Sequence, residues 1–222
     1  MGFSETLERK AQPIWRKIFS HPFVIGIGDG TLPLKKFRFY LGQDYIFLIE
    51  YCRVLALGVA KAQDLETMEK FSELLHATLH TEMALHRSYA KKFGITEEEP
   101  AKTEASPTTH AYTRYLLHVA SLGTMAELAA ALLPCQWGYA EIGQRLAKKG
   151  EPKRQPLYGN WIKTYASPEF AALASWLRGL TDRLAEGAGK AELGRMEEYY
   201  LTSSRYEYLF WEMCSRMEAW PV

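Results

Sequence analysis

The sequence predicts an all-α fold in a single domain, residues 1–222. Apolar residues recur at intervals of three and four through most of the chain, which is the spacing of a helix that buries one face. Convincing runs of strict apolar–polar alternation, the pattern of a half-buried strand, are absent from the sequence. With 222 residues, of which 47% are hydrophobic, the chain can enclose a sizeable core without a second domain.

About seven or eight helices are expected from this periodicity and from start and stop signals. The first begins near Ser4, whose hydroxyl suits an N-cap, and ends before the His21-Pro22 pair. The glycine-rich stretch 26–30 is expected to be a loop, because Thr31 stands where a dinucleotide-binding fingerprint needs its third glycine. Further helices are expected at about 33–62, 65–93, 108–121, 124–149, 158–165, after the Ser167-Pro168 start signal, and at 191–217, with an acidic connector from Glu97 to Pro107.

The balance of charge excludes several classes of partner. Lys and Arg total 27 and Asp and Glu total 26, so neither nucleic acid nor an anionic membrane is an expected partner. The longest uncharged apolar stretch, 128–140, is shorter than the roughly 20 residues that a membrane helix needs. The cysteines, Cys52, Cys135 and Cys214, form no CxxC pair, and no signal-peptide pattern is found, so the expected compartment is the cytoplasm.

Cys135 is a candidate nucleophile. It follows Pro134, which has no backbone N–H for the carbonyl of Ala130 and so creates an irregularity inside a helix, where pockets often form. The alternative is that Cys135 is simply a small buried hydrophobic residue. Cysteines outside disulfides are commonly buried, and the residues alone favour that alternative.

Two carboxylates lie among aromatic residues. Asp44 shares a helical stripe with Phe47 and Tyr51, and a buried carboxylate needs hydrogen-bond partners or a ligand that supplies them. It could equally pair with a basic residue of a neighbouring helix or point outward between the rings. Glu207 lies in the ring-rich segment 206–211, where desolvation would favour the protonated acid needed for acid–base catalysis, unless it is an ordinary surface glutamate.

Three tyrosines and a set of histidines complete the candidates. Tyr112, Tyr139 and Tyr165 could line a pocket, although most tyrosines are structural.

A metal centre is the competing interpretation of the site. The pair Glu73-x-x-His76, with Glu82 and His86 further along, is similar to half of a helical di-iron site. A second Glu-x-x-His pair is missing, so these histidines are expected at the surface or at an interface.

Several separated segments, in order, resemble the TenA family, also called thiaminase II or aminopyrimidine aminohydrolase. The similarity covers nearly the whole chain and implies a haem-oxygenase-like helical bundle that assembles as a homotetramer. The segments are His21-Pro22-Phe23 with 26–33, Phe37-x-x-Tyr40 with Gln43-Asp44, Glu82-Met83-Ala84-Leu85-His86, Leu132-Leu133-Pro134-Cys135-x-Trp137, Trp161-Ile162-x-Thr164-Tyr165 and Ser203-Ser204-x-Tyr206-Glu207-Tyr208-x-Phe210-Trp211.

The resemblance also implies roles for particular residues. Cys135 would be the nucleophile, Glu207 the acid–base residue and Asp44 the substrate-binding carboxylate near the thiol, and Asp44 is our candidate acceptor of the thiol proton. Phe47 departs from the family's pattern, in which a tyrosine hydroxyl is expected, and Tyr51 or Asp44 would compensate for it. Substrate contacts are expected from Asp44, Tyr139, Tyr165, Tyr112, Phe47 and Tyr51.

The implied reaction is hydrolysis of 4-amino-5-aminomethyl-2-methylpyrimidine, or of thiamin, to 4-amino-5-hydroxymethyl-2-methylpyrimidine. It would proceed through a covalent adduct at Cys135, serve thiamin salvage and need no metal or organic cofactor. Both substrates use the same residues, so the sequence alone does not rank them firmly, whereas the resemblance favours salvage. The remaining alternatives are a haem-oxygenase-like di-iron oxidase and a non-catalytic pyrimidine-binding regulatory module.

Overall fold

The all-α prediction is confirmed by a computed structural model, which describes residues 2–93 and 103–222 and in which every regular element of those ranges is helical. Part of the expected acidic connector, from Glu97 to residue 102, lies outside the described residues. No helix within the described ranges is long and apolar enough to cross a membrane. The chain forms two compact units, one from Met1–Pro33 with Gly123–Glu212 and the other from Leu34–Leu122 with Met213–Val222.

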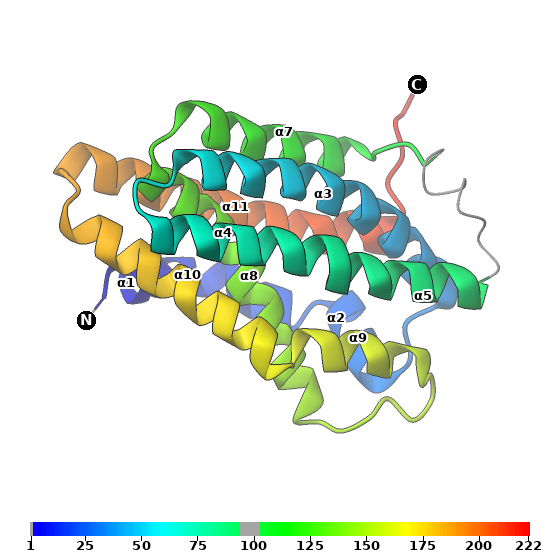
Figure 1. Cartoon of the computed structure of the whole chain (residues 1–222). Helices are drawn as coiled ribbons and strands as arrows, with labels where there is room; N and C mark the ends of the chain where they lie inside the picture. Colours follow the sequence, from blue (N-terminus) through cyan, green and yellow to red (C-terminus); the bar gives the residue numbers. More distant parts are fainter. Residues whose placement is uncertain (1, 94–102) are drawn as a thin grey trace. The chain divides into compact units, whose positions relative to one another are not determined.

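The first unit is built around α8 (Met125–Ala147), drawn in green in Figure 1. A capping box starts this helix, because the Thr124 hydroxyl accepts from the backbone N–H of Glu127 while the Glu127 carboxylate accepts from that of Thr124. The helix continues through Pro134. Its neighbours are α2 (Pro22–Asp29), α9 (Leu157–Tyr165) and α10 (Pro168–Glu186). The first helix, α1 (Phe3–Phe19), packs on α10. The last helix, α11, spans Lys190–Arg216.

The stretch 26–30, expected to be a loop, instead forms the last residues of the helix α2 and its C-cap, Gly30. His21 caps it, since its Nδ1 accepts from the N–H of Phe23 at 3.1 Å, and Pro22 occupies a first-turn position that needs no donor. Gly30 ends the helix with a φ of 70°, in the left-handed region. The prediction was wrong because glycine was taken as a turn signal, whereas Gly28 allows close packing: a Cβ there would lie 2.7 Å from the Leu146 side chain.

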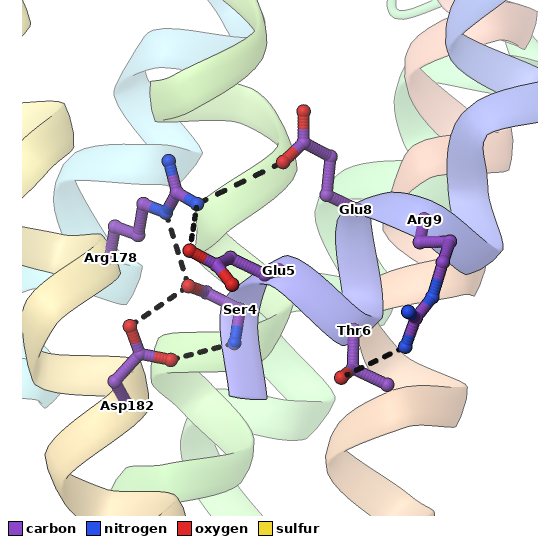
Figure 2. A network of polar contacts seen from close by, with 7 residues as sticks. All are labelled: Ser4, Glu5, Thr6, Glu8, Arg9, Arg178 and Asp182. Carbon is purple, nitrogen blue, oxygen red and sulfur yellow. Dashed lines mark hydrogen bonds and ion pairs between the residues drawn. The ribbon is translucent and has the colours of Figure 1, made fainter. Parts of the chain in front are cut away.

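The first helix begins at Phe3 rather than at Ser4, and its cap comes from another helix (Figure 2). Gly2 holds the N-cap position and has no side chain to accept a hydrogen bond. Asp182 of α10 supplies the acceptor instead: Oδ1 takes the Ser4 N–H at 2.6 Å and Oδ2 takes the Ser4 hydroxyl at 2.9 Å. The guanidinium of Arg178 donates to the same hydroxyl at 3.1 Å. This network fixes the start of α1 on α10.

The second unit is built around α3 (Leu34–Lys61), which packs against α4 (Leu65–Ala77), α5 (Met83–Phe93) and α7 (Pro107–Leu122). These helices run side by side in Figure 1. The single helix expected at 65–93 contains one irregular turn, the π-helical segment η1 (Thr78–Glu82). Wider turns of this kind occur frequently at functional sites.

One glycine determines how closely α9 approaches α8. A Cβ at Gly143 would lie 2.4 Å from the carbonyl carbon of Tyr165 and 2.7 Å from the backbone nitrogen of Ala166. Backbone atoms cannot yield as a flexible side chain can, so the end of α9 rests on α8 only because position 143 lacks a side chain. Gly143 therefore sets the position of Tyr165 in this unit.

We expect Gly143→Ala to lower the free energy of unfolding by about 1–3 kcal/mol, the usual cost of overpacking. The matched control is Gly179→Ala, because a Cβ at this helical glycine meets only the far end of the Arg183 side chain at 3.9 Å. The control should raise stability by up to about 1 kcal/mol, as Ala does in a helix interior. Urea unfolding of both variants measures the difference, and equal stability of the two would contradict the close-approach argument.

Candidate functional site

The structure divides the eight site residues predicted from the sequence between the two units. Cys135, Tyr139, Tyr165 and Glu207 belong to the first unit, and Asp44, Phe47, Tyr51 and Tyr112 belong to the second. Within the first unit the rings of Tyr139 and Tyr165 are in contact, and within the second unit the ring of Phe47 contacts those of Tyr51 and Tyr112.

Asp44 is buried on α3, with 3% of its surface exposed. Its Oδ2 accepts a hydrogen bond from the Tyr40 hydroxyl at 3.0 Å and lies 2.9 Å from Nε2 of His86 on α5. The outward orientation considered for Asp44 is therefore wrong, and the pairing with a basic residue of a neighbouring helix is present. The expectation that His86 lies at the surface or at an interface is also wrong, since only 6% of it is exposed.

Three rings extend from Asp44 along the same side of α3 and across to α7. Phe47 stacks on Tyr51, with ring centroids 5.7 Å apart, and lies 5.1 Å from the ring of Tyr112. All three rings are buried. Asp44, Phe47 and Tyr51 follow one another at the spacing of a helical stripe, as the sequence predicted. The polar edge of this group and its flat apolar faces suit a planar heteroaromatic ligand.

Cys135 differs from the other two cysteines in its access to solvent. Cys52 and Cys214 are buried, whereas Cys135 is partly exposed within an otherwise buried stretch of α8. Burial raises the pKa of Cys52 to about 11, with a further contribution from the charge of Glu82. Burial, and then the charges of Asp44 and Glu218, raise the pKa of Cys214 well above its ordinary value. The interpretation as a buried hydrophobic residue therefore fits Cys52 and Cys214 better than Cys135.

Tyr139 and Tyr165 belong to an aromatic cluster of the first unit. Their ring centroids are 4.9 Å apart, and Tyr139 also lies 5.5 Å from Trp211 of α11. Trp161 of α9 contacts both tyrosines, at 5.9 Å from Tyr139 and 4.7 Å from Tyr165. Trp161 and Trp211, which belong to the motifs of the family resemblance, pack against these rings: Trp161 against both tyrosines and Trp211 against Tyr139.

Helical register relates Cys135 to Glu207. Cys135 lies one turn before Tyr139 on α8, and Glu207 lies one turn before Trp211 on α11. Because residues four apart share a helix face, the contact between the Tyr139 and Trp211 rings places Cys135 and Glu207 on the faces of α8 and α11 that meet there. Glu207 is buried, with 3% exposed, so the surface-glutamate alternative is wrong.

Ser203 is a residue that the sequence reasoning did not assign. It lies one turn before Glu207 and is completely buried, and its hydroxyl has no hydrogen-bond partner among the described residues. A buried hydroxyl left without a partner is costly, so this position favours a bound water or ligand. The serine pair of the Ser203-Ser204 motif was the available signal.

The residues of the metal interpretation are engaged in other contacts. His86 pairs with Asp44, and Glu73 forms an ion pair with Lys70 at 2.7 Å. His76 and His80 are exposed, with ring centroids 4.2 Å apart. No group of three or more His, Cys, Asp or Glu side chains within the described ranges is arranged to hold a metal ion.

A cavity of about 480 Å³ in the first unit lies away from the predicted residues. Trp15, Phe19, Trp137 and Tyr200 supply its rings, and none of the eight predicted site residues lines it. Trp137 is two residues from Cys135, so the two side chains leave different faces of α8. The guanidinium of Arg178 covers the Trp137 ring at 4.3 Å.

The chain is thus an all-α protein in which each unit holds a buried carboxylate and a cluster of aromatic rings. The model of the TENA/THI-4/PQQC family matches residues 8–217 of the chain. An aminopyrimidine aminohydrolase of Halalkalibacterium halodurans is 50% identical over 222 residues, covering 99% of this chain and 98% of that protein.

Solved structures show the same relationship. The TenA homologue protein from P. horikoshii OT3 superimposes with a TM-score of 0.88 at 35% identity, over 97% of this chain and 99% of that chain. A domain of unknown function with a haem-oxygenase-like fold from Shewanella denitrificans shares the fold, with a TM-score of 0.75 at 14% identity, over 96% and 92% of the two chains. The chain belongs to the TENA/THI-4/PQQC family, and the expected haem-oxygenase-like fold is confirmed.

The partial exposure of Cys135, beside the burial and raised pKa values of Cys52 and Cys214, predicts selective alkylation. At about pH 8, iodoacetamide should modify Cys135 first, because the raised pKa values of Cys52 and Cys214 keep those buried thiols protonated. Mass spectrometry of peptides from the folded protein measures the order. The denatured protein is the control, in which all three should react alike, and faster labelling of Cys52 or Cys214 in the folded protein would contradict the prediction.

Proposed function

We propose that this protein is an aminopyrimidine aminohydrolase, or thiaminase II, that hydrolyses 4-amino-5-aminomethyl-2-methylpyrimidine in thiamin salvage. The observation that carries the proposal is the arrangement in the first unit, where the partly exposed Cys135 and the buried Glu207 lie on the faces of α8 and α11 that meet at the Tyr139–Trp211 contact. The name and the high identity of the Halalkalibacterium relative support the same activity.

In the proposed mechanism Cys135 and Glu207 perform covalent and acid–base steps. Glu207 gives a proton to a ring nitrogen, which makes the adjacent ring carbon electrophilic, and the Cys135 thiolate adds to that carbon. The electron pair of the ring then expels the protonated amino group from the 5-methylene as ammonia. Water adds to the methylene carbon and gives up a proton, which the ammonia can take. The C–S bond then breaks to restore the Cys135 thiolate, the ring nitrogen returns its proton to Glu207, and 4-amino-5-hydroxymethyl-2-methylpyrimidine is released.

The second unit supplies the proposed recognition group. The Asp44 carboxylate can accept an N–H of the 4-amino group, and the rings of Phe47, Tyr51 and Tyr112 can enclose a flat pyrimidine. The family resemblance, rather than any contact between the units, also makes Asp44 the proposed acceptor of the thiol proton, which a nucleophilic cysteine must lose. These side chains suffice for each step without a metal or an organic cofactor.

The cellular compartment and the oligomeric state of the enzyme are also proposed. We infer a cytoplasmic protein, on the absence of a cysteine framework suited to an oxidising compartment, and a homotetramer, on the family resemblance. A non-catalytic pyrimidine-binding module is the outcome that tight binding without turnover would indicate.

Hydrolysis of the aminomethyl pyrimidine and of thiamin, measured side by side, tests the function. We expect a much higher kcat/KM for the aminomethyl pyrimidine, and Cys135→Ser should reduce turnover of both to background because a serine hydroxyl is a far weaker nucleophile here. Calorimetry with the hydroxymethyl product should show that the variant still binds it. Wild-type-like turnover by Cys135→Ser would remove covalent catalysis, and preference for thiamin would make the protein a thiaminase.

Glu207→Gln tests the acid–base step separately. The amide keeps the size of the side chain but cannot exchange the proton, so kcat should fall by roughly 10² to 10⁴-fold. Binding of the hydroxymethyl product, measured by calorimetry, should change far less than kcat. A pH–rate profile identical to that of the wild type would assign the proton to another residue.

A further inference from the structure

We propose that His86 is a positioning residue that, together with Tyr40, occupies one oxygen of Asp44 and presents the other oxygen to the pyrimidine. This inference rests on the proposed function, because it assumes that Asp44 recognises the substrate. The sequence alone indicates only a surface or metal-binding role for this histidine.

Both donors meet the same atom of Asp44. The Tyr40 hydroxyl donates to Oδ2 at 3.0 Å, and Nε2 of His86 lies 2.9 Å from that same Oδ2. Oδ1 accepts no hydrogen bond from the described residues. Two donors from different directions define the plane of the carboxylate, so the direction of Oδ1 is determined as well.

The two donors come from elements that fix them firmly. Tyr40 lies one turn before Asp44 on α3 and is fully buried, with its ring 5.8 Å from that of Phe37. His86 comes from α5 and packs edge-on against Tyr45 at 6.3 Å. Rotation of Asp44 would break both hydrogen bonds inside the unit, where an unpaired carboxylate oxygen is costly.

The fixed direction of Oδ1 matters because a hydrogen bond from an aminopyrimidine to a carboxylate is directional. The exocyclic amino group donates along its N–H bonds, so the acceptor must lie in the plane of the ring. A carboxylate that could rotate would lose conformational freedom on binding, and prior positioning by Tyr40 and His86 removes that cost. The histidine therefore acts through Asp44 and need not touch the substrate.

The test is a double-mutant cycle read in the Kd of the hydroxymethyl product and the KM of the aminomethyl substrate. We expect His86→Leu to raise Kd and KM roughly 10- to 100-fold, the range for loss of a hydrogen bond to a charged group. His86→Gln should recover most of the loss, because its amide N–H can replace Nε2 as donor. In an Asp44→Asn background, His86→Leu should cause little further change.

Two more variants keep the result interpretable. His80→Gln changes an exposed histidine of the neighbouring turn and should leave Kd and KM unchanged. Tyr40→Phe removes the other donor to Oδ2 with minimal change of shape, and it carries the test if His86→Leu fails to fold. Circular dichroism and urea unfolding identify such a failure.

Two results would overturn the inference: folded His86→Leu and Tyr40→Phe variants with wild-type Kd and KM, or an equal loss in the Asp44→Asn background. The second result would show that His86 acts independently of Asp44. Failure of the proposed function is distinct, because it shows in the wild type as an absence of hydrolysis, whether or not the hydroxymethyl product binds. Wild-type binding and turnover with unaltered variants would refute only the role of His86.

Discussion

The burial of the Asp44 carboxylate is the constraint on which the second unit depends. A carboxylate taken out of water must be met by donors, and here they come from its own helix and from α5. The neighbouring residue, Gln43, adds a second anchor from the same turn of α3: its amide donates to the carbonyl of Glu104 at 3.0 Å and its oxygen accepts from the N–H of Ser106 at 2.9 Å. One turn of α3 therefore ties together segments from three parts of the sequence.

In the first unit one thiol, that of Cys135, is partly exposed although most of the surrounding stretch of α8 is buried. Close approach at Gly143 brings α9 onto α8, and the rings of Trp161 and Trp211 fill the space around Tyr139 and Tyr165. Aromatic packing of this kind is rigid, since each ring has few rotatable bonds. Cys135 lies one turn before Tyr139 on α8 and is itself partly exposed, whereas the rings of this cluster are buried.

The sequence predicted the helical class and most helix bounds, because apolar periodicity and caps such as Ser167 are local signals. It failed at α2, where glycines allow close packing. It also failed at the start of α1, because the acceptor for the Ser4 N–H is Asp182, which lies far away in the sequence. It selected Cys135, Asp44 and Glu207 as candidates by their neighbours in sequence, and their roles stay predictions. It missed His86 as the partner of Asp44, and it missed Ser203, whose hydroxyl has no partner in the part of the chain that the structure describes, because both properties arise only from packing.

The π-helical turn at Thr78–Glu82 makes the orientation of His86 depend on the number of residues in this segment more than on their identity. A π turn holds one residue more than an α turn, and each residue of an α-helix rotates the side chains that follow by about 100°. Deletion of a single residue within the turn would let the segment close into a regular helix and turn His86 away from Asp44. Substitutions at exposed positions of the turn leave the rotation intact, so this part of the chain should tolerate changes of residue far better than changes of length.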